Sequence, residues 1–144
     1  MPAGWCMVAS AKPPMLAVSV APARHTHKLI RACQAFTIAI PGPGMGAMVE
    51  YTGSVSGRDV DKVKAASLEM KPSTKIAPPL LAGAVANFEC HLAASLEAGD
   101  HTIFVGEVVA AHIDDEAAGR LLNFGPGLYA LAQPMPGTEY LVQS

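Results

Sequence analysis

Charged residues are scarce in this 144-residue sequence. They make up 15% of the chain, whereas an ordinary soluble domain carries about a quarter. With 10 Lys and Arg against 12 Asp and Glu, the chain lacks the basic surplus typical of nucleic-acid binding, so nucleic acid is not an expected partner. The apolar fraction of 51% excludes a disordered chain. Because so small a domain has much surface to cover, we expect some apolar area to be buried against a second subunit or a ligand.

Uninterrupted apolar runs and paired cysteines are missing as well. The uncharged stretches 32–49 and 121–138 contain prolines, so neither predicts a membrane-spanning helix. The first residues lack the charged and apolar regions of a signal peptide. Three cysteines, Cys6, Cys33 and Cys90, indicate reduced thiols rather than a disulfide framework or a zinc site. We therefore expect one domain, residues 1–144, in the cytoplasm, with no membrane partner.

The hydrophobic pattern predicts a mainly β chain with short helices between the strands. This order favours an antiparallel barrel over a doubly wound parallel sheet. Strands are predicted over residues 5–9, 15–21, 35–40, 85–96, 102–113 and 124–131. The strand 102–113 is apolar on both faces in its first half and is expected to be central. A hairpin turn is expected at 98–100, and an irregular surface segment at 71–79.

Side-chain directions follow from the same patterns. Alternation in strand 85–96 predicts that Phe88, Cys90 and Leu92 point inward and that Asn87, Glu89 and His91 point outward. Helical spacing predicts that one face of a helix capped by Thr26 carries the apolar residues Leu29, Ile30 and Cys33. Further helices are expected over 45–51, after Asp59 to about Ser67, and from Glu116.

Two helix starts carry the residues of an anion site. The loop 53–58 supplies Ser54, Ser56 and Gly57 before a helix start, and Arg58 and Lys62 add two positive charges. A capped surface helix with ordinary charges is the alternative. Ser19, Arg24 and Thr26 lie where a buried strand leads into another helix, and could hold an anion or serve as a solvated charge and a cap. If the two loops meet at one end of a barrel, they can share one phosphate.

Histidines offer a second kind of chemistry. His101 follows the hairpin turn beside Asp100, where it can donate a hydrogen bond or carry a proton, or simply be a partly exposed structural residue. His25 and His27 lie close to Arg24, but their spacing matches no known zinc motif, so no metal is expected. The sequence also lacks the nucleophile-elbow, zincin, Walker and Rossmann motifs.

Four segments together resemble the flavin reductase-like, FMN-binding split-barrel family that includes flavoredoxin. The segments are SVAPARHTHKLI at 19–30, YTGSVSGRDVDK at 51–62, AVANFEC at 84–90 and AGDHTIFVGEV at 98–108. They follow the family's order and spacing. The resemblance implies a Greek-key split β-barrel with short peripheral helices that binds FMN at a homodimer interface. Family members have further residues before the position of Trp5, so we expect this barrel to lack the family's first strand.

The resemblance also implies roles for individual residues. The FMN phosphate would lie at Arg24, Thr26, Ser56 and Lys62. The flavin ring would lie against Trp5, Cys6 and Met7, with Ser19, Gly53 and Ser54 nearby. His101 would lie by the flavin face and the nicotinamide.

Three hypotheses follow for the function. The first is an FMN-dependent oxidoreductase that takes hydride from NADH or NADPH and passes electrons onward. The second is a flavoredoxin-type electron carrier without NAD(P)H activity of its own. The third is a truncated, inactive homodimeric module. A redox partner protein is open in the first two.

Overall fold

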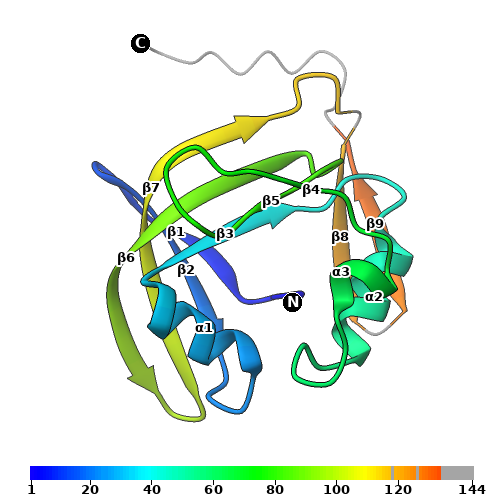
Figure 1. The fold of residues 1–144 in the computed structure, drawn as a ribbon. Coiled ribbons are helices and arrows are strands. Elements are labelled where there is room, and N and C mark those ends of the chain that lie inside the picture. The colour runs from blue at the N-terminus through cyan, green and yellow to red at the C-terminus, as the bar shows by residue number, and fades with distance from the viewer. Residues whose placement is uncertain (118, 126, 134–144) are drawn as a thin grey trace.

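The computed structural model describes residues 1–117, 119–125 and 127–133 of the chain. Its centre is a five-stranded antiparallel sheet in the order β1-β2-β7-β6-β3. Figure 1 shows this sheet curving around the core, with α1 beside it and with α2, α3 and the last hairpin on the opposite side. The fold is mainly β with few short helices, as the sequence predicts.

The bounds of the elements agree with most of the predicted ones. The strands are β1 (Cys6–Ala11), β2 (Pro14–Val20), β3 (Ala35–Ile40), β4 (Met70–Lys71), β5 (Leu80–Leu81), β6 (Ala86–Ala98), β7 (His101–Ile113), β8 (Arg120–Gly125) and β9 (Leu128–Ala132). The helices are α1 (His25–Cys33), α2 (Gly46–Ser54) and α3 (Lys62–Ala65). The prediction that the second long strand is central is confirmed, because β7 lies between β2 and β6.

The core lies between the sheet and α1. Its buried members are Val18, Val20, Ile30, Phe36, Cys90 and Phe104. Gly106 of β7 is needed here, since a Cβ atom at this position would lie 2.5 Å from Cζ of Phe36 and 2.7 Å from Cβ of Cys90. The side chain of Phe36 therefore packs across the backbone of the central strand.

Three predicted helix features are wrong. Arg24 occupies the N-cap position of α1 and no side chain caps it, so Thr26 lies within the first turn. The buried residues of α1 are His27 and Ile30, whereas Leu29 is 52% exposed and Cys33 is exposed. The third helix begins at Lys62, where Asp61 and not Asp59 is the cap and accepts a hydrogen bond from the backbone N–H of Lys64. Asp59 instead lies in a turn closed onto the carbonyl of Ser56.

The chain near Glu116 and the first strand residues of β6 also differ from prediction. The described residues 115–116 form a turn, and β8 and β9 pair as two antiparallel strands where a short helix and one strand were expected. Asn87 and Glu89, expected to point outward, are 6% and 0% exposed. They are buried because the segment 72–79 packs on Glu89 and β5 packs on Asn87, whose amide hydrogen-bonds the Leu81 backbone. Alternation within one strand cannot reveal such packing.

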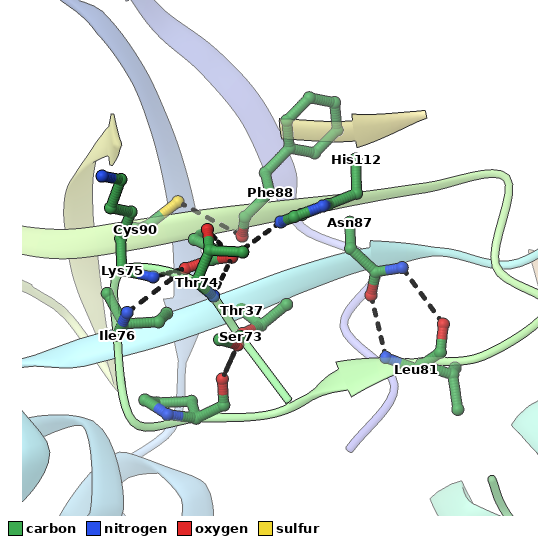
Figure 2. A network of polar contacts seen from close by, with 12 residues as sticks. Thr37, Ser73, Thr74, Lys75, Ile76, Leu81, Asn87, Phe88, Cys90 and His112 are labelled. Carbon is green, nitrogen blue, oxygen red and sulfur yellow. Dashed lines mark hydrogen bonds and ion pairs between the residues drawn. The ribbon is translucent and has the colours of Figure 1, made fainter. Parts of the chain in front are cut away.

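That segment makes a network of polar contacts around the Glu89 carboxylate. The carboxylate accepts hydrogen bonds from the backbone N–H groups of Thr74, Lys75 and Ile76, from the Thr74 hydroxyl and from Nε2 of His112 (Figure 2). Burial raises the pKa of Glu89, but the hydrogen bonds from Thr74, His112 and Lys75 outweigh it and hold the pKa at about 2. The charged carboxylate thus fixes an otherwise irregular loop to the sheet.

Candidate functional site

Two cavities lie at the end of the barrel where β2 leads into α1. The first has a volume of about 480 Å³ and lies between the start of α1 and residues 57–62. The second has a volume of about 260 Å³ and lies between the N-terminal segment, the end of β2 and the start of β7. Met1 lines both cavities, so they adjoin one another.

The first cavity brings two of the predicted phosphate residues together. Thr26 from α1 and Lys62 from the start of α3 both line it, with His25 and Arg58. Its walls meet closely, since a Cβ atom on Gly57 would lie 3.6 Å from the His25 ring. A guanidinium N–H of Arg58 donates to the carbonyl oxygen of Ala23 at 2.8 Å, which ties the loop to the residues before α1.

Lys62 is the centre of positive charge in this region. Its ammonium group donates a hydrogen bond to the carbonyl oxygen of Thr52 at the end of α2. Burial lowers the pKa of Lys62, and the nearby Arg24 guanidinium lowers it further. Within the part of the chain that the structure describes, neither Arg24 nor Lys62 forms an ion pair with a carboxylate. Two cations near enough to affect one another favour an anion close to both.

The second cavity collects residues from three separate parts of the chain. Trp5, Ser19 and His101, which the resemblance implies for the flavin ring, all line it. Arg24, which the resemblance implies for the phosphate, lines this second cavity rather than the first. The Trp5 and His101 rings lie 4.6 Å apart between centroids, at an interplanar angle of 43°. They meet across β2, because its Ser19 N–H donates to the Trp5 carbonyl on one side and its Val20 lies opposite Thr102 of β7, next to His101, on the other.

His101 is oriented by its neighbour. Its Nδ1 lies 2.7 Å from a carboxylate oxygen of Asp100, and this hydrogen bond holds the pKa of Asp100 below its ordinary value. Because a carboxylate accepts, Nδ1 carries the proton and Nε2 is left to accept a hydrogen bond in the neutral ring. His101 therefore offers an oriented polar atom beside an aromatic side chain.

Five predicted site residues line neither cavity. Cys6 and Met7 lie on β1 and are exposed. Ser54 donates to the carbonyl of Tyr51 within α2, and Gly53 lies in the same helix with Pro2 nearby. Ser56 accepts a hydrogen bond from the backbone N–H of Arg58 at 3.2 Å, so its hydroxyl shapes the loop. The expected loop 53–58 therefore begins only after Ser54.

The chain matches the family model for the flavin reductase like domain over residues 1–132. A relative from Archaeoglobus fulgidus, itself uncharacterized, is 36% identical over 109 residues, which are 76% of this chain. The chain spans 62% of the length of that relative.

Solved structures with this fold include several flavin proteins. The FMN-binding protein of Thermus thermophilus has a TM-score of 0.82 and 35% identity, and the match covers 92% of this chain and 77% of that one. A flavoredoxin from Methanosarcina acetivorans has a TM-score of 0.83 and 26% identity, with 97% and 80% covered. An NADH:FAD oxidoreductase of Streptomyces globisporus has a TM-score of 0.79 and 26% identity, with 90% and 75% covered.

These matches and the curved sheet define the fold as a split β-barrel of the FMN-binding type. The chain belongs to the flavin reductase-like family. The resemblance noted in the four sequence segments is thereby confirmed. None of the helices in the described ranges has the length and hydropathy that crossing a membrane requires.

Proposed function

We propose that this chain binds FMN and transfers hydride from NADH or NADPH to the flavin, from which electrons pass to an acceptor. The observation that carries the proposal is the pair Arg24 and Lys62, two neighbouring cations without a carboxylate partner among the described residues. The FMN phosphate is a dianion near neutral pH, and such a pair is suited to bind it. The flavin names of the structural relatives support the same cofactor.

The residues present fit FMN at both of its ends. Arg24, Lys62 and the Thr26 hydroxyl supply charge and hydrogen bonds for a phosphate, and Ser56 shapes the loop that leads to Lys62. Trp5, Ser19 and His101 supply an aromatic surface and polar atoms for the ring. Contacts of the ring with Cys6, Met7, Gly53 and Ser54 remain predictions from the resemblance.

The chemistry asked of the protein is mainly positioning. Bound FMN would supply the hydride-accepting ring, and reduced nicotinamide the hydride. Arg24 and Lys62 would bind the negative charge of the phosphate, and the Trp5 side chain that lines the second cavity would give the flavin ring an aromatic surface. His101, held by Asp100, presents Nε2 to a polar group of either ring or moves a proton at that atom. NADH and NADPH are equally compatible with these residues.

The deciding experiment is the visible spectrum of the purified protein. Addition of FMN is expected to give a bound-flavin spectrum at stoichiometric amounts, and NADH or NADPH is expected to bleach it under anaerobic conditions. A protein that does not change the absorbance or fluorescence of FMN on titration would refute the proposal.

A flavoredoxin-type carrier is the second candidate, favoured by the flavoredoxin match that covers 97% of this chain. It also binds FMN, so the titration does not separate the two. A protein whose bound FMN is bleached by dithionite or by a redox partner protein, but by neither NADH nor NADPH, would be the carrier.

We also propose that the chain acts as a homodimer. Exposed apolar side chains gather on the edge strand β1, where Met7 and Val8 are 65% and 72% exposed, and Trp5 precedes them at 66%. A second copy that covers this surface would account for the low charge content of the chain.

A further inference from the structure

His27 is a buried histidine that the proposed reaction does not use directly. It is the third residue of α1 and is 8% exposed, whereas its neighbour Thr26 lines the first cavity. Its Nε2 lies 2.9 Å from the hydroxyl oxygen of Thr102, which is 2% exposed. Both partners of this hydrogen bond are therefore shielded from solvent.

The surroundings hold the imidazole in one place. The His27 ring packs edge-on against Phe104 of the core, with 5.0 Å between centroids. Burial lowers the pKa of His27, Arg31 lowers it further, and Glu97 acts in the opposite direction. The neutral ring is thus the stable form at neutral pH, and it can share one hydrogen bond with the Thr102 hydroxyl.

This hydrogen bond joins the two ends of the candidate site. Thr102 follows His101 directly in β7 and pairs with Val20 at the end of β2. His27 follows Thr26, one turn from Arg24 at the helix N-cap. The link therefore crosses from the anion-binding start of α1 to the strand residue beside the second cavity. Figure 1 shows the start of α1 and the β6–β7 hairpin side by side.

We propose that His27 and Thr102 are positioning residues that set the spacing between the phosphate-binding start of α1 and His101. The inference rests on the proposed function, since it assigns a purpose to the link only if FMN spans the two cavities. An apolar pair could fill the same space without a directional bond. A hydrogen bond instead fixes one register of the helix on the strand.

The test compares binding of FMN with binding of riboflavin, which lacks the phosphate. Thr102→Val keeps the side-chain shape but removes the hydroxyl, and Thr102→Ser keeps the hydroxyl. We expect Thr102→Val to reduce the preference for FMN over riboflavin about tenfold, the equivalent of one misaligned charge-assisted hydrogen bond. Thr102→Ser should retain the preference. General loosening of the fold would weaken both flavins alike and leave their ratio unchanged.

Thr37→Val is the matched control. The Thr37 hydroxyl is also partly buried in a strand and donates to the carbonyl of Pro78, away from both cavities. It should leave the FMN preference at its original value. His27→Leu removes the same hydrogen bond by replacing the histidine, and it serves as the test variant if Thr102→Val does not fold. Where both variants fold, the double variant should lose no more preference than either single one.

The outcomes separate this inference from the proposed function. A folded Thr102→Val or His27→Leu protein with the original FMN preference would overturn the positioning role while the proposed function stands. If the original protein binds riboflavin as tightly as FMN, or binds neither, the proposed phosphate site fails and the positioning role fails with it.

Discussion

The environment of Lys62 disfavours the charged form of its side chain. Burial and the neighbouring Arg24 both lower the pKa of Lys62, and its hydrogen bond to the Thr52 carbonyl supplies only a neutral acceptor. An anion placed between the two cations would relieve this repulsion. The two side chains should therefore act mainly through the phosphate of the ligand.

Removing either cation should weaken FMN binding. Lys62→Ala and Arg24→Ala are each expected to cost about 1–3 kcal/mol of binding free energy, because each removes one charge-assisted hydrogen bond. Affinity for riboflavin should change little. Fluorescence titration of each variant with both flavins measures the difference.

Lys28→Ala is the control for overall charge. Lys28 lies on the same helix as Thr26 and is exposed, and it lines neither cavity. The variant should bind FMN as the original chain does. Equal loss of affinity in Lys28→Ala would show a general charge effect in place of a phosphate site.

Among the elements, the segment 72–79 between β4 and β5 is fixed to the sheet by the Glu89 side chain. It has no long strand or helix of its own, yet three consecutive backbone N–H groups point at the Glu89 carboxylate of β6 (Figure 2). His112 of β7 donates to the same group, so the carboxylate joins a loop to two strands. These hydrogen bonds explain why the charged residue Glu89 is tolerated on a buried face of β6.

Glu89→Gln should destabilise the fold. The substitution keeps the size but places an NH₂ group against N–H donors, and each donor left without an acceptor costs about 1–3 kcal/mol. We expect a lower free energy of unfolding at neutral pH, measured by urea denaturation. Glu97→Gln is the control, since Glu97 is exposed and pairs with Arg31 at 3.7 Å, a contact worth less than about 1 kcal/mol.

The free energy of unfolding lost in Glu89→Gln should depend on pH in a defined direction. The pKa of Glu89 is about 2 in the folded chain against an ordinary value of 4.5, so its contribution is present above pH 4.5 and is lost as pH falls toward 2. The stability difference between the original chain and Glu89→Gln should therefore shrink over this range. A difference that stays constant on acidification would contradict the assignment of this carboxylate.

At the scale of the molecule, the scarcity of charge corresponds to exposed apolar side chains on β1. Val8 is 72% exposed although it lies in the middle of a strand at the edge of the main sheet. An edge strand with apolar, uncovered side chains tends to associate with another chain. This is the basis for the proposed homodimer.

Val8→Lys should weaken self-association. The original chain is expected to sediment as a dimer, and the variant should raise its dissociation constant by at least about tenfold, because a charge would be buried at the interface. Val63→Lys on α3 is the matched control, as Val63 is an exposed valine on another element. A monomeric original chain, or an unchanged constant in Val8→Lys, would refute the role of β1.

Much of the fold could be predicted because strand patterns are local. Ala35–Ile40 alternates and is a strand, and the apolar start of His101–Ile113 correctly indicated the central position. For the site, helix starts and strand ends singled out Arg24, Thr26, Lys62, Ser19 and His101, and the resemblance added Trp5. All six line the two cavities, whereas their roles toward a flavin stay predictions. Helix starts and strand ends are likewise local features. The absence of the family's first strand stays a prediction.

The sequence by itself determined the strands of the main sheet and which polar residues stand at their ends, since both depend on neighbours along the chain. Only the tertiary structure decided that Glu89 is buried, that His27 and not Leu29 faces the core, and that Arg24 lies near Lys62. These facts depend on which distant segments pack together. Packing between distant segments, which one segment's periodicity does not encode, sets the electrostatics of the site.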